Sequence, residues 1–288
     1  MQLRSQQVTS SSEWLAEPIL PAVRPLAGPA VRLFLTSAVV LFVELILIRW
    51  IPANVTYIGF FRNFLLMASF LGIGAGILFG RDPRRLPISP FALVLLGVTA
   101  LVGSATLEVE IATEGEVFFG LSESQGGDPG FLVLSLIVML TSIVMAALAL
   151  PLGRLLTSMP PLRAYAIDIG GSMTGIAGFS ILSALGTPPA LWFAVAAGIL
   201  GLLTLGAGVS RWSIASGVML AGVVGLSIAQ QPPATTWSPY YRISEHQTGP
   251  VTSLNVNGIP HQALWPIEAP YKEDFYEQVY RWFPDRTF

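Results

Sequence analysis

Three ionisable residues lie inside long apolar stretches of the sequence, where buried charge could carry out chemistry. They are Glu44, Arg62 and Asp168. A charged side chain at the centre of a bilayer costs about 2.5–3.5 kcal/mol on insertion scales, so such residues usually face a partner or a watery cavity. We expect Glu44 and Arg62 to pair, because the segment that holds Arg62 starts on the side where the segment that holds Glu44 ends. Asp168 enters from the opposite side, so a relay of all three is not expected.

The Glu44–Arg62 pair has a functional and a structural interpretation. The functional one is a transport or substrate site for a small solute. The structural one, which we favour, is an ion pair that locks two membrane segments together. A metal site is not predicted, because the chain has no cysteine and its two histidines, His246 and His261, cannot form one by themselves.

The composition predicts that lipid is the main solvent of this chain. Of its 288 residues, 53% are hydrophobic and 11% are charged, against about 25% charged residues in soluble domains. The net charge of −2 provides no basic surface for nucleic acid. Seven apolar runs are long enough to cross a hydrocarbon core of about 30 Å. They lie near residues 31–51, 57–80, 88–107, 131–151, 164–185, 188–209 and 211–229.

The predicted fold is an all-α bundle of about seven transmembrane helices with a small β-hairpin or ribbon plus helix module behind it. Residues 1–30 form an N-terminal tail, residues 31–229 the bundle and residues 230–288 the module. Arginines gather in alternate loops, starting with the tail, so the tail is predicted to be cytoplasmic. Seven crossings place the module outside. If residues 188–229 do not cross twice, the module lies in the cytoplasm, and the sequence leaves both arrangements open.

Glycines at four-residue spacing occur in two of the apolar runs. Gly72, Gly76 and Gly80 lie in one run, and Gly171 and Gly175 lie in another. Small residues at this spacing let helix backbones approach closely in lipid. We expect helix packing rather than a nucleotide-binding loop, because no strand precedes the glycines.

The module after residue 230 combines β and α signals. "YYRIS" and "VTSLNV" are typical of short strands, and Asn257-Gly258 favours a type I′ turn that returns the chain through "IPHQAL". From Lys272 onward the apolar residues follow helical spacing until Pro284. So small a module cannot bury its many aromatic rings, so we expect a further domain, another chain or the membrane surface to cover them.

The order of these motifs, "YYRI…LNVNG…HQ…FYEQVY", resembles the entry segment of spermidine synthases, the polyamine aminopropyltransferases. The whole chain is similar to bacterial membrane-bound spermidine synthase-like proteins, in which a multi-span region opens with a segment like "ELILIRW…FFRNFLLMASFLGIGAG". The resemblance implies a multi-pass protein of the bacterial inner membrane. It also implies that Gln262 contacts an adenosyl ligand and that Tyr276 lines the amine pocket. Glu277 and Gln278 follow Tyr276, where the family has a His–Glu pair.

In that family a methyltransferase-like Rossmann domain follows the entry segment, and its glycine-rich loop holds decarboxylated S-adenosylmethionine. This chain has no glycine after Gly258, so we expect no cofactor and no catalytic residue in the chain alone. The first hypothesis is the membrane-embedded half of a split or truncated spermidine synthase-like protein, which anchors or serves a separate methyltransferase-fold subunit. The alternatives are a small-solute transporter that uses Glu44 and Arg62, and a non-catalytic structural subunit of a larger membrane complex.

Overall fold

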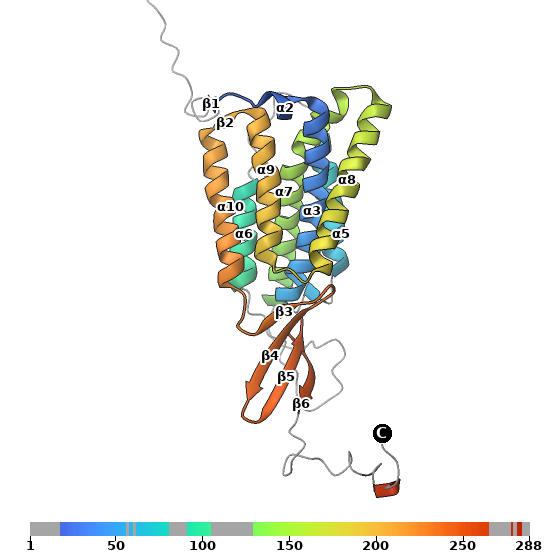
Figure 1. The fold of residues 1–288 in the computed structure, drawn as a ribbon, viewed down its shortest axis with the longest axis vertical. Coiled ribbons are helices and arrows are strands. Elements are labelled where there is room, and N and C mark those ends of the chain that lie inside the picture. The colour runs from blue at the N-terminus through green and yellow to red at the C-terminus, as the bar shows by residue number, and fades with distance from the viewer. Residues whose placement is uncertain are drawn as a thin grey trace, which may run out of the picture.

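The protein is an upright bundle of helices with a β-sheet that extends from one end (Figure 1). The computed structural model describes residues 18–55, 58–59, 62–80, 91–104, 129–264, 278 and 281–283. The helices of the described residues are α2 (Arg24–Ala27), α3 (Pro29–Asn54), α5 (Arg62–Gly80), α6 (Phe91–Ser104), α7 (Pro129–Thr157), α8 (Pro161–Ala184), α9 (Pro189–Ala207) and α10 (Arg211–Ala229). The strands are β1 (Pro18–Leu20), β2 (Val209–Ser210), β3 (Thr235–Trp237), β4 (Arg242–Thr248), β5 (Val251–Val256) and β6 (Ile259–Leu264).

Six helices are long and apolar enough to cross a membrane: α3, α5, α7, α8, α9 and α10. The fold is therefore a helical bundle suited to a multi-pass membrane protein, as the sequence predicts. Helix α6 occupies the third predicted span but has only 14 residues, which is roughly 21 Å of helix at 1.5 Å per residue. The count of seven spans is not confirmed, because this helix is shorter than the roughly 30 Å of hydrocarbon that a span must cross.

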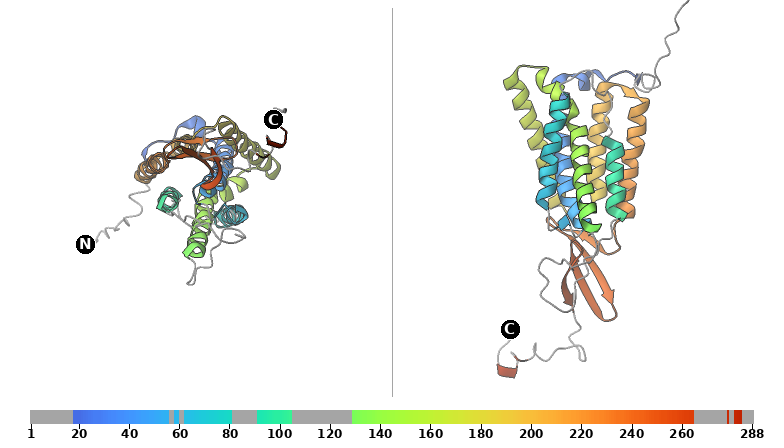
Figure 2. Two further views of the ribbon diagram at one scale, coloured as in Figure 1. Left: turned by 90° about the horizontal axis from the view of Figure 1, so that it is seen from below. Right: turned by 180° about the vertical axis from the view of Figure 1, so that it is seen from behind.

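Helix α3 lies at the centre of the bundle and is the most enclosed of the six candidate spans. Its buried side chains include Val39, Val43, Ile46 and Leu47, none of which is exposed. Helices α5, α7, α8 and α9 lie around it (Figure 2). A helix that is apolar on every side belongs in the interior of a bundle.

Helices α5 and α7 are packed backbone to backbone. Gly72, Gly76 and Gly80 of α5 each face a carbonyl oxygen of α7, so that no side chain would fit between the two helices. In the same order, these carbonyls belong to Ser142, Ala146 and Leu150. The predicted packing role of the glycines is confirmed here, because lipid supplies no hydrophobic drive between helices and close backbone approach replaces it.

The segment of residues 188–229 forms two helices, α9 and α10, joined by Gly208 and the short strand β2. Gly208 has a φ of 93°, a conformation that glycine adopts without strain. Strand β1 pairs antiparallel with β2 above this turn, and α2 packs against α9. The N-terminal elements and the large sheet therefore lie at opposite ends of the bundle (Figures 1 and 2).

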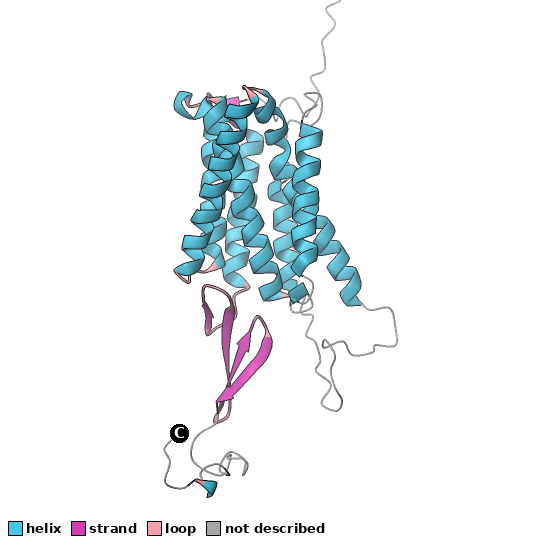
Figure 3. Ribbon diagram, turned by 90° about the vertical axis from the view of Figure 1, so that its right-hand side faces the viewer, coloured by secondary structure: helices cyan, strands magenta, loops and turns pink. Residues whose placement is uncertain are grey.

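The large sheet has four antiparallel strands in the order β3-β4-β5-β6. Asn257 and Gly258 connect β5 to β6 with φ values of 53° and 82°, as the predicted type I′ turn requires. Strand β3 was not predicted, and it adds a fourth strand to the expected ribbon. The helix predicted between Lys272 and Pro284 lies mostly outside the described residues. Figure 3 shows the sheet projecting away from the helices.

Candidate functional site

Asp168, the acidic residue that lies within α8, connects this helix to α3. The Ser37 hydroxyl of α3 donates to Asp168 Oδ1 at 2.5 Å. Gly171 and Gly175, one and two turns further along α8, face carbonyl oxygens of α3 at Phe34 and Ala38. The hydrogen bond and the glycine contacts follow the same α3–α8 interface, so Asp168 has a structural partner inside the bundle.

Glu44 and Arg62 are not brought together. Glu44 is 3% exposed, and its Oε1 has no hydrogen-bond partner in the described part of the chain. Arg62 is exposed and donates from Nε to the Gly59 carbonyl at 3.2 Å. No salt bridge joins Glu44 to Arg62, both of which are among the described residues. The predicted pair is wrong because α5 begins at Arg62, whereas Glu44 lies ten residues before the end of α3, roughly 15 Å deeper.

Arg62 instead lies at the junction between the bundle and the sheet. Together with Tyr241 and Asn257 it lines a cavity of about 200 Å³ at this end of the bundle. Two further arginines, Arg49 of α3 and Arg242 of β4, belong to the same junction, which we define by the contacts described below.

Arg49 fastens the end of α3 to the start of the sheet. Its guanidinium lies over the ring of Trp192 at 4.8 Å from the centroid and over that of Trp237 at 5.7 Å. Its Nη2 donates to the carbonyl of Ser238. A guanidinium within about 6 Å of an aromatic face is attracted by the ring quadrupole. One side chain therefore binds a helix, α9, and the strand β3 at the same time.

Aromatic rings continue this attachment into the bundle. Trp237 of β3 meets Trp192 edge to face at 5.1 Å, and Trp192 meets Phe179 of α8 at 5.3 Å. Phe179 in turn meets Phe42 of α3 at 5.8 Å. Such pairs add about 0.5–1.5 kcal/mol each beyond their burial. Trp237 is only 5% exposed, so the bundle itself covers this ring of the module.

Arg242 fastens β4 to the same end of α3. Its Nη1 donates to Asn54 Oδ1 at 2.7 Å, and its backbone N–H donates to Asn257 Oδ1 at 2.9 Å. Burial lowers the pKa of the Arg242 guanidinium from its usual value, because a desolvated cation is less stable. The Ser183 hydroxyl at the end of α8 also donates to the Pro239 carbonyl, at 3.0 Å.

The junction is suited to holding two parts together rather than to catalysis. In its polar contacts, Arg49, Arg242 and Ser183 donate to backbone carbonyl or side-chain amide oxygens. Within the described residues, no group of three or more histidine, cysteine, aspartate or glutamate side chains could hold a metal ion. The side chains at the junction offer hydrogen-bond donors and aromatic faces for binding and positioning.

Beyond the junction, the sheet leaves one edge uncovered. All six residues of β6 are exposed, and among the described residues β6 pairs on one side only, with β5. Gln262, which the resemblance links to an adenosyl ligand, lies on this strand opposite Leu254 and is exposed. His261 beside it is exposed too. Tyr276 lies outside the described residues.

Sequence reasoning missed the junction, although two signals for it were present. Arg49 stands near the end of the first apolar run with no acidic residue one turn away, so it needed a partner from another element. The second signal is aromatic: Trp192 lies near the start of a predicted span, where interfacial rings are common, and Trp237 lies in the module whose rings need a cover. Only the fold shows that these residues meet.

A comparison of the chain with known protein families, characterised proteins and solved structures found no match.

Proposed function

We propose that this chain is the membrane-embedded half of a spermidine synthase-like protein, and that its sheet receives a separate methyltransferase-fold subunit. The observation that carries the proposal is the four-stranded sheet itself. It projects from the bundle in the part of the chain where the resemblance predicts the entry segment, and it ends in the exposed edge strand β6.

An exposed edge strand supports the presence of a partner. Its unpaired N–H and C=O groups are a template for another chain, and proteins commonly cover, shorten or charge such edges. Between Ile259 and Leu264 the only ionisable side chain is that of His261, so little charge protects the edge. Ile259 and Leu264 are 37% and 45% exposed. A sheet also needs a second layer to bury a face, and in the described residues the bundle covers only its Trp237 end.

The subunit that docks there would supply the chemistry. By resemblance, its glycine-rich loop would hold decarboxylated S-adenosylmethionine, and Gln262 of this chain would reach the adenosyl group from β6. Gln262 can play this part, because its side chain is exposed on the free strand and a primary amide both donates and accepts hydrogen bonds. The bundle would anchor the enzyme to the bilayer, and the junction would fix the sheet relative to the membrane.

Capture of the partner from native membranes tests this proposal. The full chain, purified in a mild detergent, should retain a subunit that mass spectrometry identifies as methyltransferase-like. Leu264→Lys places a charge on the free edge and should abolish the capture. His246→Lys is the matched control, because His246 is also exposed but lies on the inner strand β4. A partner of another fold would favour the structural-subunit alternative, and a homo-oligomer without a partner would contradict the proposal.

The side of the membrane on which the sheet lies provides a second test. Adenosyl cofactors are cytoplasmic, so aminopropyl transfer requires a cytoplasmic sheet. The arginine-rich loops at the other end of the bundle predict an external sheet instead. A reporter fused after Phe288 distinguishes these two positions. A cytoplasmic reporter supports the proposal, whereas a periplasmic one rules out an aminopropyltransferase partner.

A further inference from the structure

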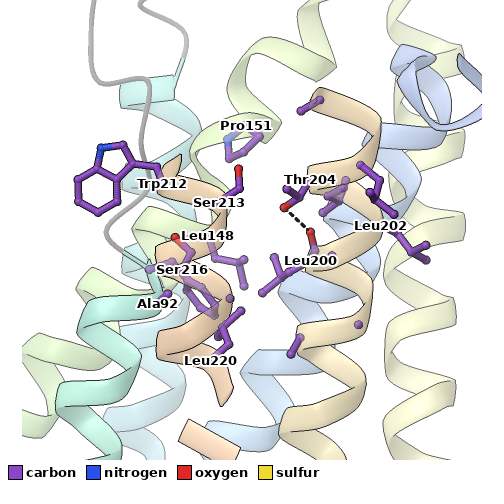
Figure 4. A pocket seen from close by; sticks show the side chains of 18 of the residues that line it. Ala92, Leu148, Pro151, Leu200, Leu202, Thr204, Trp212, Ser213, Ser216 and Leu220 are labelled. Atoms are coloured by element: carbon purple, nitrogen blue, oxygen red, sulfur yellow. Dashed lines mark hydrogen bonds between the residues drawn. The ribbon is translucent and has the colours of Figure 1, made fainter. Parts of the chain in front are cut away.

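A cavity of about 750 Å³ lies between α9 and α10 in the half of the bundle away from the sheet, and residues of α3, α6 and α7 complete its walls. Figure 4 shows α10 on one side of it, with Trp212, Ser216 and Leu220, and α9 on the other, with Leu200 and Thr204. Ligand pockets commonly measure about 300–1,000 Å³. The cavity is therefore large enough for a substantial part of an organic molecule.

The walls of the cavity are apolar. Hydroxyl groups are its main polar side chains, and no ionisable side chain is among the described residues that line it. The Thr204 hydroxyl donates to the Leu200 carbonyl at 2.9 Å, and Ser213 pairs with Ser210 at 3.1 Å. These hydroxyls are already bonded within the protein, so the space favours a hydrocarbon chain over a charged group.

Three glycines enlarge this cavity. At Gly198, Gly201 and Gly217, an added Cβ would meet no atom within 4 Å. Apart from proline, glycine is the least favourable residue inside a helix, so each of these positions lowers helix stability. Helix packing offsets that cost for the glycines of α5 and α8, whereas a Cβ at these three would touch no atom of another helix. Their effect on the structure is to widen the space between α9 and α10.

The cavity communicates with the outer surface of the bundle. Leu202 and Leu205 line it and are also 42% and 40% exposed. Helix α10 is the least enclosed of the six candidate spans, and its exposed residues include Ile214 and Val218. In a bilayer this outer surface faces hydrocarbon, so a molecule that enters the cavity comes from the lipid phase.

Two arginines lie next to residues that line the cavity. The Val23 N–H donates to the carbonyl of Leu205, a lining residue, at 2.9 Å, which places Arg24 beside it. Thr36, also a lining residue, donates to the carbonyl of Arg32 at 2.7 Å. Arg32 Nε is buried and has no hydrogen-bond partner, and neither arginine forms a salt bridge with a described residue.

We propose that the cavity holds one acyl chain of an anionic glycerophospholipid, with the phosphate at the level of Arg24 and Arg32. The apolar walls fit the chain, and the two arginines supply charge complementary to the headgroup. Basic sites between transmembrane helices bind anionic lipid headgroups in this way, and each arginine near the membrane surface adds to the attraction. The site lies at the opposite end from the sheet, so it does not depend on the proposed function.

Native mass spectrometry of the full chain tests this site. The protein is purified in a mild detergent and incubated with equal amounts of phosphatidylglycerol and phosphatidylcholine that carry the same acyl chains. We expect phosphatidylglycerol to be retained about tenfold or more over phosphatidylcholine. Equal retention of both lipids would overturn the anionic assignment. A lipid-free dimer joined through α9 and α10 would also overturn the proposal, because a second copy of the chain would then cover the cavity.

Two kinds of variant test the contributions of the cavity and of the arginines to lipid binding separately. Gly217→Leu fills the cavity and should reduce phosphatidylglycerol retention about tenfold, whereas Gly225→Leu should leave it unchanged. Gly225 is the matched control, because it lies on the same helix, meets no atom within 4 Å and does not line the cavity. Full retention by a folded Gly217→Leu variant would refute the site. If that variant does not fold, the double variant Arg24→Gln/Arg32→Gln provides the test. Its retention of phosphatidylglycerol should fall to that of phosphatidylcholine. An unchanged ratio of the two retained lipids would refute the proposal.

Discussion

Glycine residues have two different roles in this protein, and only the surroundings of each residue distinguish them. Gly76 and Gly171 allow backbones to touch, whereas Gly201 and Gly217 border open space. The four-residue spacing in α5 and α8 was sufficient to predict the first role, because packing in lipid favours that pattern. The second role could not be predicted, since it depends on which neighbours are absent.

We expect Gly76→Ala to destabilise the bundle by about 1–3 kcal/mol, as overpacking does in a tight interior. The new methyl group would collide with the carbonyl of Ala146 on α7, so α5 and α7 would have to separate. Reversible unfolding in detergent with increasing denaturant measures the change. Gly74→Ala is the control: its Cβ meets no atom within 4 Å, so the variant should be as stable as the original or more stable by up to about 1 kcal/mol. Similar values for both variants would contradict the packing model.

The hydrogen bond between Ser37 and Asp168 should contribute measurably to the α3–α8 interface. Double-mutant cycles in membrane proteins give an average of about 0.6 kcal/mol and a maximum of about 1.7 kcal/mol for such bonds. We expect a coupling energy in this range from Ser37→Ala, Asp168→Ala and the double variant, measured by the same unfolding assay, because alanine at either position removes a partner of the hydrogen bond. A coupling energy of zero would show that the 2.5 Å contact does not stabilise the fold.

At the scale of elements, the sequence predicted where helices and strands lie but not how the sheet is attached. The apolar runs coincide with α3 and with α5 to α10, because a bilayer dictates both length and polarity. Asn257 and Gly258 predicted the turn between β5 and β6, because a type I′ turn needs a positive φ at both central residues and Asn-Gly adopts it readily. The attachment depends on Arg49, Trp192 and Trp237, which are distant in sequence. No local pattern could pair them, and for the same reason Glu44 was wrongly paired with Arg62.

We expect Trp237→Ala to loosen the sheet from the bundle. Removing a buried tryptophan costs about 3–5 kcal/mol, and the lost ring contacts both Trp192 and the Arg49 guanidinium. Limited proteolysis should therefore cut the segment after α10 much faster, while the helices remain protected. Tyr240→Ala is the matched control, since Tyr240 is 78% exposed on the same segment. Equal cleavage of both variants would mean that the aromatic contacts do not hold the sheet.

At the scale of the whole molecule, charge is distributed unevenly between the two ends. The end that carries β1 and α2 also carries arginines from four other places in the bundle. These are Arg32 of α3, Arg154 of α7, Arg163 of α8 and Arg211 of α10. At the sheet end Arg49 and Arg242 bind the sheet, and Arg62 at the start of α5 is exposed. The asymmetry matches the positive-inside rule only if the sheet lies outside.

The absence of cysteine from the sequence allows a direct test of this arrangement. Ser158→Cys introduces a thiol between α7 and α8, and Ser253→Cys introduces one in β5 of the sheet. The structure places these positions at opposite ends of the bundle, so a membrane-impermeant maleimide added to intact cells should label only one of them. The arginine distribution predicts labelling at Ser253→Cys. Labelling at Ser158→Cys alone would reverse the orientation and place the sheet where adenosyl cofactors are found. Labelling of both would contradict the structure, because three candidate spans, α8, α9 and α10, separate the two positions along the chain.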